Sequence, residues 1–228
     1  MSGFLDVLKG LDWTYLLDLL LRIIPALLCI MIHEICHGLA AYALGDRTAA
    51  RQGRLSLNPL RHIDWFGLVM LVAFRIGWAK PVQVDMRNFK KPKRDMAITG
   101  LAGPASNFVL AALALFVFGL CYAPLIKSGT LGNYALRLLD NIAYLSIALG
   151  LFNLIPFPPL DGSKVLFSFL PDRLYLRLMY LERYGMLALV AIVLILNRVF
   201  DVSPITLAGT AVYNVFFEIA VWANGLTL

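Results

Sequence analysis

The chain has 228 residues, of which 60% are hydrophobic and 15% are charged, and its mean hydropathy is +0.77. Soluble domains carry about 25% charged residues, so this composition excludes an ordinary soluble fold and predicts a polytopic membrane protein. The net charge of +6 does not indicate a nucleic-acid-binding surface, because the basic residues fall mostly in connections between apolar segments. The three cysteines are scattered through apolar segments and do not form a disulfide framework.

The first apolar segment predicts one long helix over residues 11–44. Such a helix would be roughly 50 Å long, whereas the hydrocarbon core of a bilayer is about 30 Å thick, so the helix must tilt or protrude. The connection that follows, residues 45–64, is polar and basic. Within it, residues 54–57 alternate in the manner of a short strand, and Asn58-Pro59 predicts a turn at its end.

The next part of the chain mixes short apolar and basic stretches. Residues 65–78 are mostly apolar, but about 14 residues are too few to span a bilayer, which favours a re-entrant or interfacial segment. Residues 80–85 alternate again, and we expect them to pair with residues 54–57 as a small β-hairpin or sheet. Residues 87–95 then carry five basic side chains.

Four further apolar segments predict membrane helices at residues 96–122, 136–154, 184–200 and 205–222. Prolines interrupt the chain after the second of them, and residues 163–179 look amphipathic and interfacial. We therefore expect an all-α polytopic membrane protein with five to six membrane helices, a small β-hairpin and a re-entrant segment. The expected organisation is a single membrane-embedded domain over residues 1–228, with its core at about 12–170 and two C-terminal membrane helices at about 184–226.

The basic residues predict how the helices are oriented. The connections 45–64, 80–95 and 157–183 hold fourteen of the twenty Lys and Arg residues, and the positive-inside rule places all three in the cytoplasm. The first helix would then run inward, and His33 and His37 would lie nearer its inner end. Asp161 follows the inner end of the helix at 136–154, so polar groups 124 residues apart (37 to 161) reach the same side of the membrane.

The sequence His33-Glu34-Ile35-Cys36-His37 lies inside the first apolar segment. Residues four apart share one face of a helix, so His33 and His37 can hold one metal ion. Glu34 lies beside them, where it can take a proton from a water that the metal activates. Ionisable groups at membrane depth are costly, and by default they indicate function. The pattern therefore predicts a hydrolytic zinc site inside a bilayer.

Catalytic zinc typically has three protein ligands and a fourth position for water. His62 and Asp161 are the main candidates for the third ligand. Asp161 is favoured because it lies in a proline-rich break at the end of an apolar segment, where irregular backbone requires neighbouring protein or a water-filled cavity. The simpler alternative is that Asp161 only forms a turn before Gly162.

The His-Glu-x-x-His pattern in an apolar helix, followed far downstream by Asn153-Leu154-Ile155-Pro156-Phe157-Pro158-Pro159-Leu160-Asp161-Gly162, resembles the site-two protease family of intramembrane zinc metalloproteases. Residues 53–64, 77–82 and 102–107 resemble its compact prokaryotic form, which lacks a PDZ insert. The resemblance covers about residues 20–170, and all five motifs occur in the order that the family shows.

This resemblance implies one zinc ion (Zn²⁺) per chain, held by His33, His37 and Asp161, with Glu34 as the general base. It also implies that Asn153 contacts the substrate or the oxyanion of the scissile carbonyl, and Asn107 is a second candidate for that contact. The implied reaction is hydrolysis of a peptide bond in or near the transmembrane helix of a membrane-protein substrate.

The expected location follows from the same resemblance and from the charge distribution. We expect a multi-pass protein of a prokaryotic inner or plasma membrane, with its active site towards the cytoplasm and the lipid bilayer around it. No nucleic-acid partner is expected, and a homo-oligomer stays open as one alternative for its assembly.

Two other functions stay open at the level of sequence. A zinc transporter would need a polar path through both leaflets, whereas the ionisable residues gather mainly at one depth. A non-catalytic membrane scaffold derived from the protease would have no need of Glu34.

Overall fold

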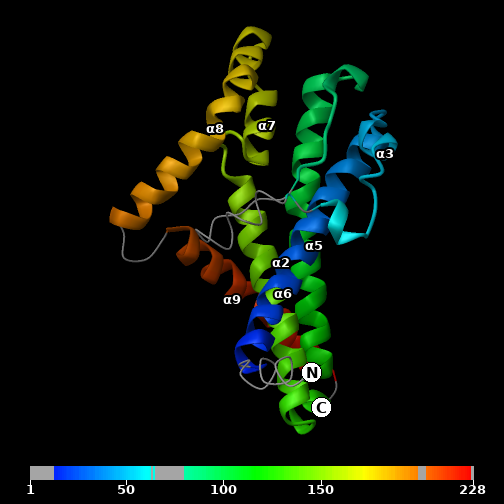
Figure 1. Cartoon of the computed structure of the whole chain (residues 1–228), viewed down its shortest axis with the longest axis vertical. Coiled ribbons are helices and arrows are strands. Elements are labelled where there is room, and N and C mark those ends of the chain that lie inside the picture. The colour runs from blue at the N-terminus through cyan, green and yellow to red at the C-terminus, as the bar shows by residue number, and fades with distance from the viewer. Residues whose placement is uncertain (1–12, 63, 65–79, 200–203, 227–228) are drawn as a thin grey trace, which may run out of the picture.

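The computed structural model describes residues 13–62, 64, 80–199 and 204–226, and these residues contain helices and no strand. Five of the helices are long, and Figure 1 shows three of them running side by side along the length of the molecule. The long helices are α2 (Trp13–Ala43), α5 (Pro92–Lys127), α6 (Thr130–Leu154), α8 (Asp172–Val199) and α9 (Pro204–Gly225). The short elements are α3 (Thr48–Arg51), α7 (Asp161–Ser168) and 3₁₀ turns at Pro59–Arg61 and Met86–Asn88.

Four of the described helices are long and apolar enough to cross a membrane, namely residues 16–43 of α2, α5, α6 and residues 206–225 of α9. The all-helical expectation is thereby confirmed, whereas five to six spans are not. Helix α8, which contains residues 184–199 of the span expected at 184–200, is not among these four. The amphipathic segment expected at 163–179 is divided between α7 and this first half of α8.

Helix α5 is the centre of the bundle, because it contacts α2, α6, α7 and α9. The apolar core between these helices includes Cys29 of α2 and Leu115 of α5, which are 1% and 0% exposed. Gly119 of α5 lies so close to the backbone of Ala220 in α9 that a Cβ would not fit between them. Small residues thus allow the close contact of helices that membrane packing requires.

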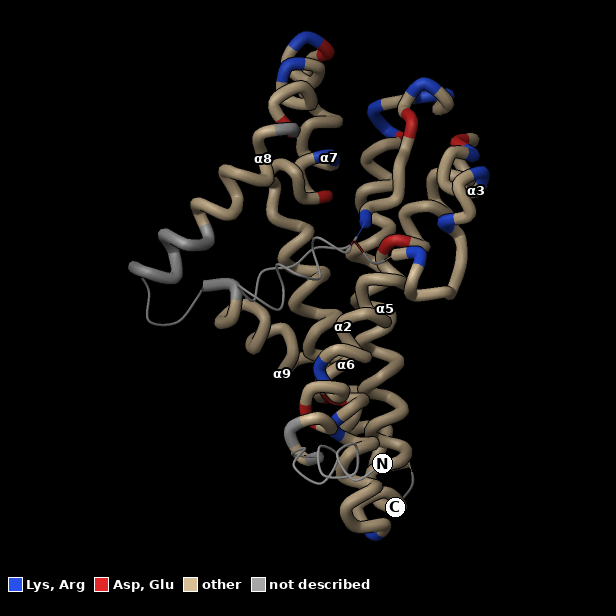
Figure 2. The backbone as a smooth tube through the Cα atoms, viewed as in Figure 1, with Lys and Arg blue, Asp and Glu red and all other residues tan. Residues whose placement is uncertain are grey.

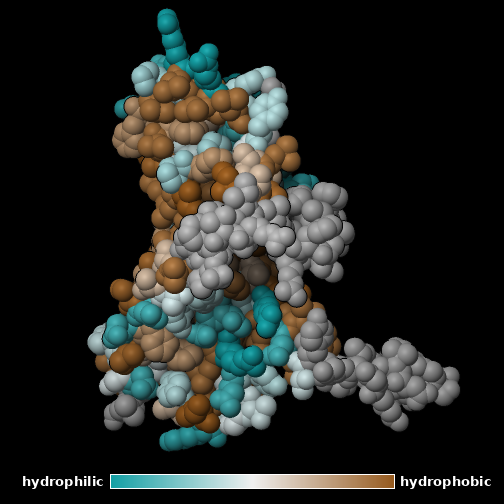
Figure 3. All heavy atoms as spheres, turned by 90° about the vertical axis from the view of Figure 1, so that its left-hand side faces the viewer, coloured by the Kyte–Doolittle hydropathy of each residue, from teal (hydrophilic) through white to brown (hydrophobic). Residues whose placement is uncertain are grey.

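Charged residues gather at one end of the molecule. Figure 2 shows most Lys and Arg residues near α3, α7 and the beginnings of α5 and α8. In the space-filling view, hydrophilic residues also collect towards the lower end of the molecule, below a broad apolar zone (Figure 3). The three basic connections of the sequence therefore meet at one end of the bundle.

The expected pairing of residues 54–57 with residues 80–85 does not form in the described part of the chain. Three backbone N–H groups of the second segment are instead bound by acceptors of other elements, which leaves these three unavailable to a neighbouring strand. These bonds run from Lys80 to the His62 carbonyl (2.9 Å), from Val82 to Glu34 Oε2 (2.8 Å) and from Asp85 to Asp46 Oδ2 (2.7 Å). The expected re-entrant segment at 65–78 lies outside the described residues.

Candidate metal centre and active site

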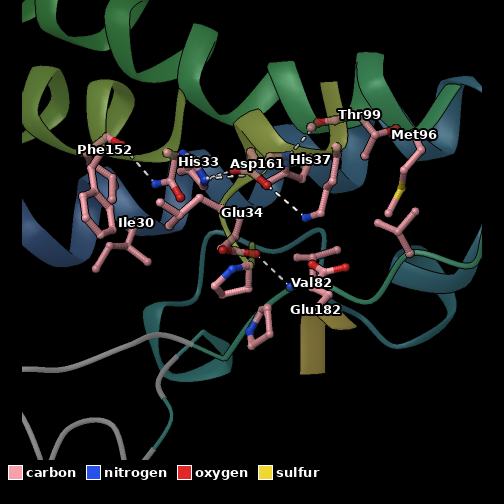
Figure 4. Close-up of a pocket in the computed structure, with 18 of the residues that line it drawn as sticks. Ile30, His33, Glu34, His37, Val82, Met96, Thr99, Phe152, Asp161 and Glu182 are labelled. Carbon is pink, nitrogen blue, oxygen red and sulfur yellow. Dashed lines mark hydrogen bonds and ion pairs between the residues drawn. The ribbon is translucent and has the colours of Figure 1, made fainter. Parts of the chain in front are cut away.

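His33 and His37 lie one turn apart on α2, and Asp161 is the first residue of α7. All three side chains are buried, with exposed fractions of 4%, 8% and 6%. The two Nε2 atoms lie 2.9 Å apart, and Asp161 Oδ2 lies 3.1 Å from that of His33 and 3.0 Å from that of His37 (Figure 4). The fold thus brings together three side chains that the sequence separates by up to 128 residues.

The chemistry of these three atoms fits a cation between them. His37 Nδ1 lies 2.7 Å from the Thr99 carbonyl, so its proton belongs there and Nε2 of a neutral His37 carries a lone pair. The Asp161 carboxylate has no proton to donate either, so among the three atoms only His33 Nε2 could supply one. Tetrahedral zinc with bonds of 2.0–2.1 Å would separate its ligand atoms by about 3.3 Å, which is close to the observed distances.

Glycines of α5 form the floor under this group. Gly103 lies so close to both imidazole rings that a Cβ there would come within 3.0 Å of ring atoms of His37 and His33. Gly100, one turn earlier, lies against the Asp161 carbonyl and the Lys164 side chain. The small-residue stretch of α5 therefore lets α2 and α7 approach each other across its surface.

Glu34 lies in the same cavity as the three buried side chains. The cavity has a volume of about 740 Å³, and it is also lined by Asn153 of α6. Glu34 Oε2 accepts a hydrogen bond of 2.8 Å from the N–H of Val82, which also lines the cavity (Figure 4). A carboxylate held in this way can exchange a proton with a group bound beside the metal ligands.

The other expected residues divide into one that lines the cavity and two that do not. Asn153 lines it, and its Nδ2 donates to the Leu149 carbonyl at 3.0 Å. Asn107 is 0% exposed and does not line this cavity, so its position does not fit contact with a substrate. His62 bonds through Nε2 to the Ser56 carbonyl at 2.8 Å and does not join the group of three metal-ligating side chains in the described residues.

Two charged residues at the site were not predicted from the sequence. Lys164 Nζ lies 3.0 Å from Asp161 Oδ1, which leaves Oδ2 directed at the imidazoles. Burial alone would lower the pKa of Lys164, but the carboxylates of Asp161 and Glu182 outweigh burial and raise it. Glu182 comes from α8 and lines the same cavity. The i,i+3 spacing of Asp161 and Lys164 was a usable signal, whereas nothing in the sequence connects Glu182 to the site.

Asp46 is a further residue that sequence reasoning missed. It is 0% exposed, and its carboxylate accepts hydrogen bonds from Thr48 N–H (3.0 Å), Asp85 N–H (2.7 Å) and Asn88 Nδ2 (2.8 Å). Burial alone would raise the pKa of Asp46, but these hydrogen bonds outweigh burial and lower it. Asp46 therefore holds residues 80–88 against the end of α2. The same segment contains Val82, whose N–H binds Glu34.

Comparison with known proteins places the chain in a family. The sequence profile described as Peptidase family M50 matches residues 123–196, which include Asp161. The "Putative zinc metalloprotease YwhC" of Bacillus subtilis is 36% identical over 164 residues, which cover 72% of this chain and 75% of that protein. The chain belongs to peptidase family M50. The expected relationship to the site-two proteases, which this family contains, is thereby confirmed.

A second relative with a lower identity is also named as a zinc metalloprotease. The "Putative zinc metalloprotease Rip2" of Mycolicibacterium smegmatis is 29% identical over 180 residues, which cover 76% of this chain and 67% of that protein. No solved structure matches the chain.

Proposed function

We propose that this M50 peptidase is an intramembrane zinc metalloendopeptidase, which hydrolyses a peptide bond in or near the transmembrane helix of a membrane-protein substrate. The observation that carries the proposal is the convergence of His33, His37 and Asp161, whose ligand atoms lie within 3.1 Å of one another beside Glu34. The four helices that are long and apolar enough to span a membrane support a reaction at membrane depth.

The proposed mechanism assigns the proton transfers to Glu34. A zinc ion held by His33, His37 and Asp161 would lower the pKa of water at the site and polarise the scissile carbonyl. The Val82 N–H holds Glu34 Oε2 and leaves Oε1 without a hydrogen bond from this segment. Glu34 Oε1 would take a proton from the attacking water, and the same carboxyl group would give it to the leaving amine.

We assign substrate contact to Asn153 and not to Asn107. Asn153 lines the cavity, and a turn of its side chain away from the Leu149 carbonyl would direct Nδ2 at a substrate carbonyl. Such a donor stabilises the negative charge that develops on the carbonyl oxygen in the transition state.

We further propose that the protein is a multi-pass protein of a prokaryotic inner or plasma membrane, with its active site towards the cytoplasm. The gathering of basic residues at the end of the bundle that holds α7 supports this orientation. Residues 1–228 would then act as one membrane-embedded domain, and its substrate partner would be a membrane protein with a transmembrane helix.

The deciding experiment is cleavage of a panel of single-span membrane proteins by the purified full-length chain in liposomes. We expect cleavage by the wild type, none with a zinc chelator, and a loss of at least about 100-fold in Glu34→Gln, because general-base catalysis contributes about 10²–10⁴-fold. Glu218→Gln on the exposed face of α9 is the matched control and should cleave normally.

Elemental analysis of the same preparations separates the possible failures. Glu34→Gln should keep its zinc, since Glu34 is not one of the three converging ligands. Undiminished cleavage by Glu34→Gln, or well-folded wild type without zinc, would contradict the proposal. Zinc flux through liposomes that survives Glu34→Gln would favour a transporter instead.

A further inference from the structure

His33 and His37 differ in the hydrogen bonding of Nδ1, the ring nitrogen that does not point at the other ligand atoms. His37 Nδ1 bonds to the Thr99 carbonyl at 2.7 Å, whereas His33 Nδ1 is buried and has no hydrogen-bond partner among the described residues. A metal-ligating histidine almost always donates its second N–H to an acceptor, which fixes the tautomer and the ring orientation. Since His33 directs Nε2 at the other ligands, its proton belongs on Nδ1, and that proton requires an acceptor.

Asn107 offers the complementary group. Its side chain is 0% exposed, and within the described part of the chain both Oδ1 and Nδ2 lack a partner. Buried side-chain amides without any hydrogen bond are rare in native proteins, because burial removes the bonds that water would make. Asn107 Oδ1 on α5 is therefore a buried acceptor without a partner, and His33 Nδ1 on α2 is a buried donor without one among the described residues. The two helices contact each other.

The packing of α5 on α2 places Asn107 on the side of His33. The two helices run in opposite directions, as their colours in Figure 1 show, so passing along α5 means passing back along α2. Thr99 binds His37, and Gly103, one turn on, already contacts both His37 and His33. Asn107 lies four residues after Gly103 on the same face of α5. Since Thr99 faces His37 and Gly103 faces both imidazoles, Asn107 lies on the side of His33 that is away from His37.

We infer that Asn107 is a positioning residue whose Oδ1 accepts the Nδ1–H of His33, either directly or through one buried water. Such a water needs two or more polar partners, and His33 Nδ1 with the Asn107 amide provides them. This contact would hold His33 Nε2 towards the metal, as the Thr99 carbonyl holds His37. The inference rests on the proposed zinc site and gives Asn107 a role in that site, in place of the expected contact with the oxyanion.

The experiment measures the zinc affinity of the full-length protein by competition with a chromophoric chelator. Asn107→Leu keeps the size of the side chain and removes the acceptor, whereas Asn107→Asp keeps an acceptor. We expect Asn107→Leu to bind zinc about 10- to 100-fold more weakly, the usual effect of losing such a contact, and Asn107→Asp to restore most of the affinity. The visible spectrum of the cobalt(II)-substituted protein should change in Asn107→Leu, because the orientation of His33 changes.

Asn141→Leu is the matched control, because Asn141 of α6 donates to the Leu21 carbonyl of α2 and so also joins two helices, but outside the metal centre. It should keep wild-type zinc affinity and the wild-type cobalt spectrum. If Asn107→Leu does not fold, Asn107→Ala removes the same acceptor without adding apolar bulk.

Four outcomes would each overturn a claim, and they are distinguishable. Wild-type affinity in the folded Leu or Ala variant would overturn the role of Asn107, as would equal losses in Asn107→Asp and Asn107→Leu. An equal loss in Asn141→Leu would show a general effect of helix packing. Absence of zinc binding by the wild type would instead overturn the proposed function.

Discussion

Two glycines determine how closely the helices approach the three ligand atoms. Gly103 leaves room for both imidazoles on the surface of α5, and Gly162 leaves room for the backbone carbonyls of Leu154 and Ile155 next to Asp161. A Cβ at either position would meet these groups at less than 3.0 Å, a distance that real Cβ atoms essentially never show. The geometry of the metal centre thus depends on the lack of a Cβ at Gly103 and Gly162 as well as on the three ligands.

Gly103→Ala should therefore disrupt the centre without touching a ligand. We expect the added Cβ to push the His33 and His37 rings apart, with a loss of bound zinc and a fall of about 1–3 kcal/mol in stability, as for other overpacked cores. Zinc content by elemental analysis and the thermal midpoint would measure both effects. Gly209→Ala on α9 is the control, because a Cβ there has no heavy atom within 4 Å; equal zinc content in the two variants would contradict the argument.

The sequence predicted the ligands better than the residues that support them. His33 and His37 follow from helical spacing, and Asp161 follows from the break after an apolar segment and from the family resemblance. Asp46 carried no such signal, because its role comes from hydrogen bonds to Asp85 and Asn88, which lie 39 and 42 positions later in the sequence. Likewise, Glu182 reaches the cavity only because α8 packs back over α7.

At the scale of elements, the segment 80–88 shows why alternation in a sequence does not identify a strand. Its pattern of alternating side chains requires an extended backbone, and the structure agrees in having residues 80–85 outside any helix. The acceptors of its N–H groups are the carboxylates of Glu34 and Asp46 and the carbonyl of His62. A sequence shows that these donors exist, but it does not show where the fold puts their acceptors.

Asp46→Ala should release this segment from the end of α2. We expect the amides of residues 80–88 to exchange with solvent faster and cleavage to fall, because each hydrogen bond to a charged group contributes about 1.5–3 kcal/mol. Hydrogen exchange followed by mass spectrometry would show the opening, and exchange in α5 should stay unchanged. Unaltered exchange in residues 80–88 would show that Asp46 does not hold the segment.

The same carboxylate predicts a pH dependence. Because the pKa of Asp46 is lowered in the folded state, its stabilising contribution is complete above the unfolded pKa of about 3.9 and is lost as the pH falls through the folded pKa. The difference in thermal midpoint between the wild type and Asp46→Asn should therefore shrink as the pH is lowered below about 4. Asp172→Asn, which removes only an exposed ion pair with Lys93, should change stability little at any pH.

At the scale of the whole molecule, the candidate metal centre joins parts of the bundle that have few other contacts. Helices α2 and α7 both pack on α5, and their side chains meet at His33, His37 and Asp161. The long helices and the clustering of basic residues at one end could be predicted from hydropathy and charge. The position of α8 could not, because the sequence does not show that Gly185 packs closely against the Pro158 carbonyl of the proline-rich loop.

A metal that joins α2 to α7 should stabilise the whole protein, since it binds the folded chain and the unfolded chain has no formed site. Free zinc at 100 times its Kd would contribute about 2.7 kcal/mol, so we expect a chelator to lower the thermal midpoint of the wild type and added zinc to restore it. His37→Ala should begin with a lower midpoint and respond to neither treatment. If removal of zinc, verified by elemental analysis, leaves the wild-type midpoint unchanged, then the three side chains do not join the helices through an ion.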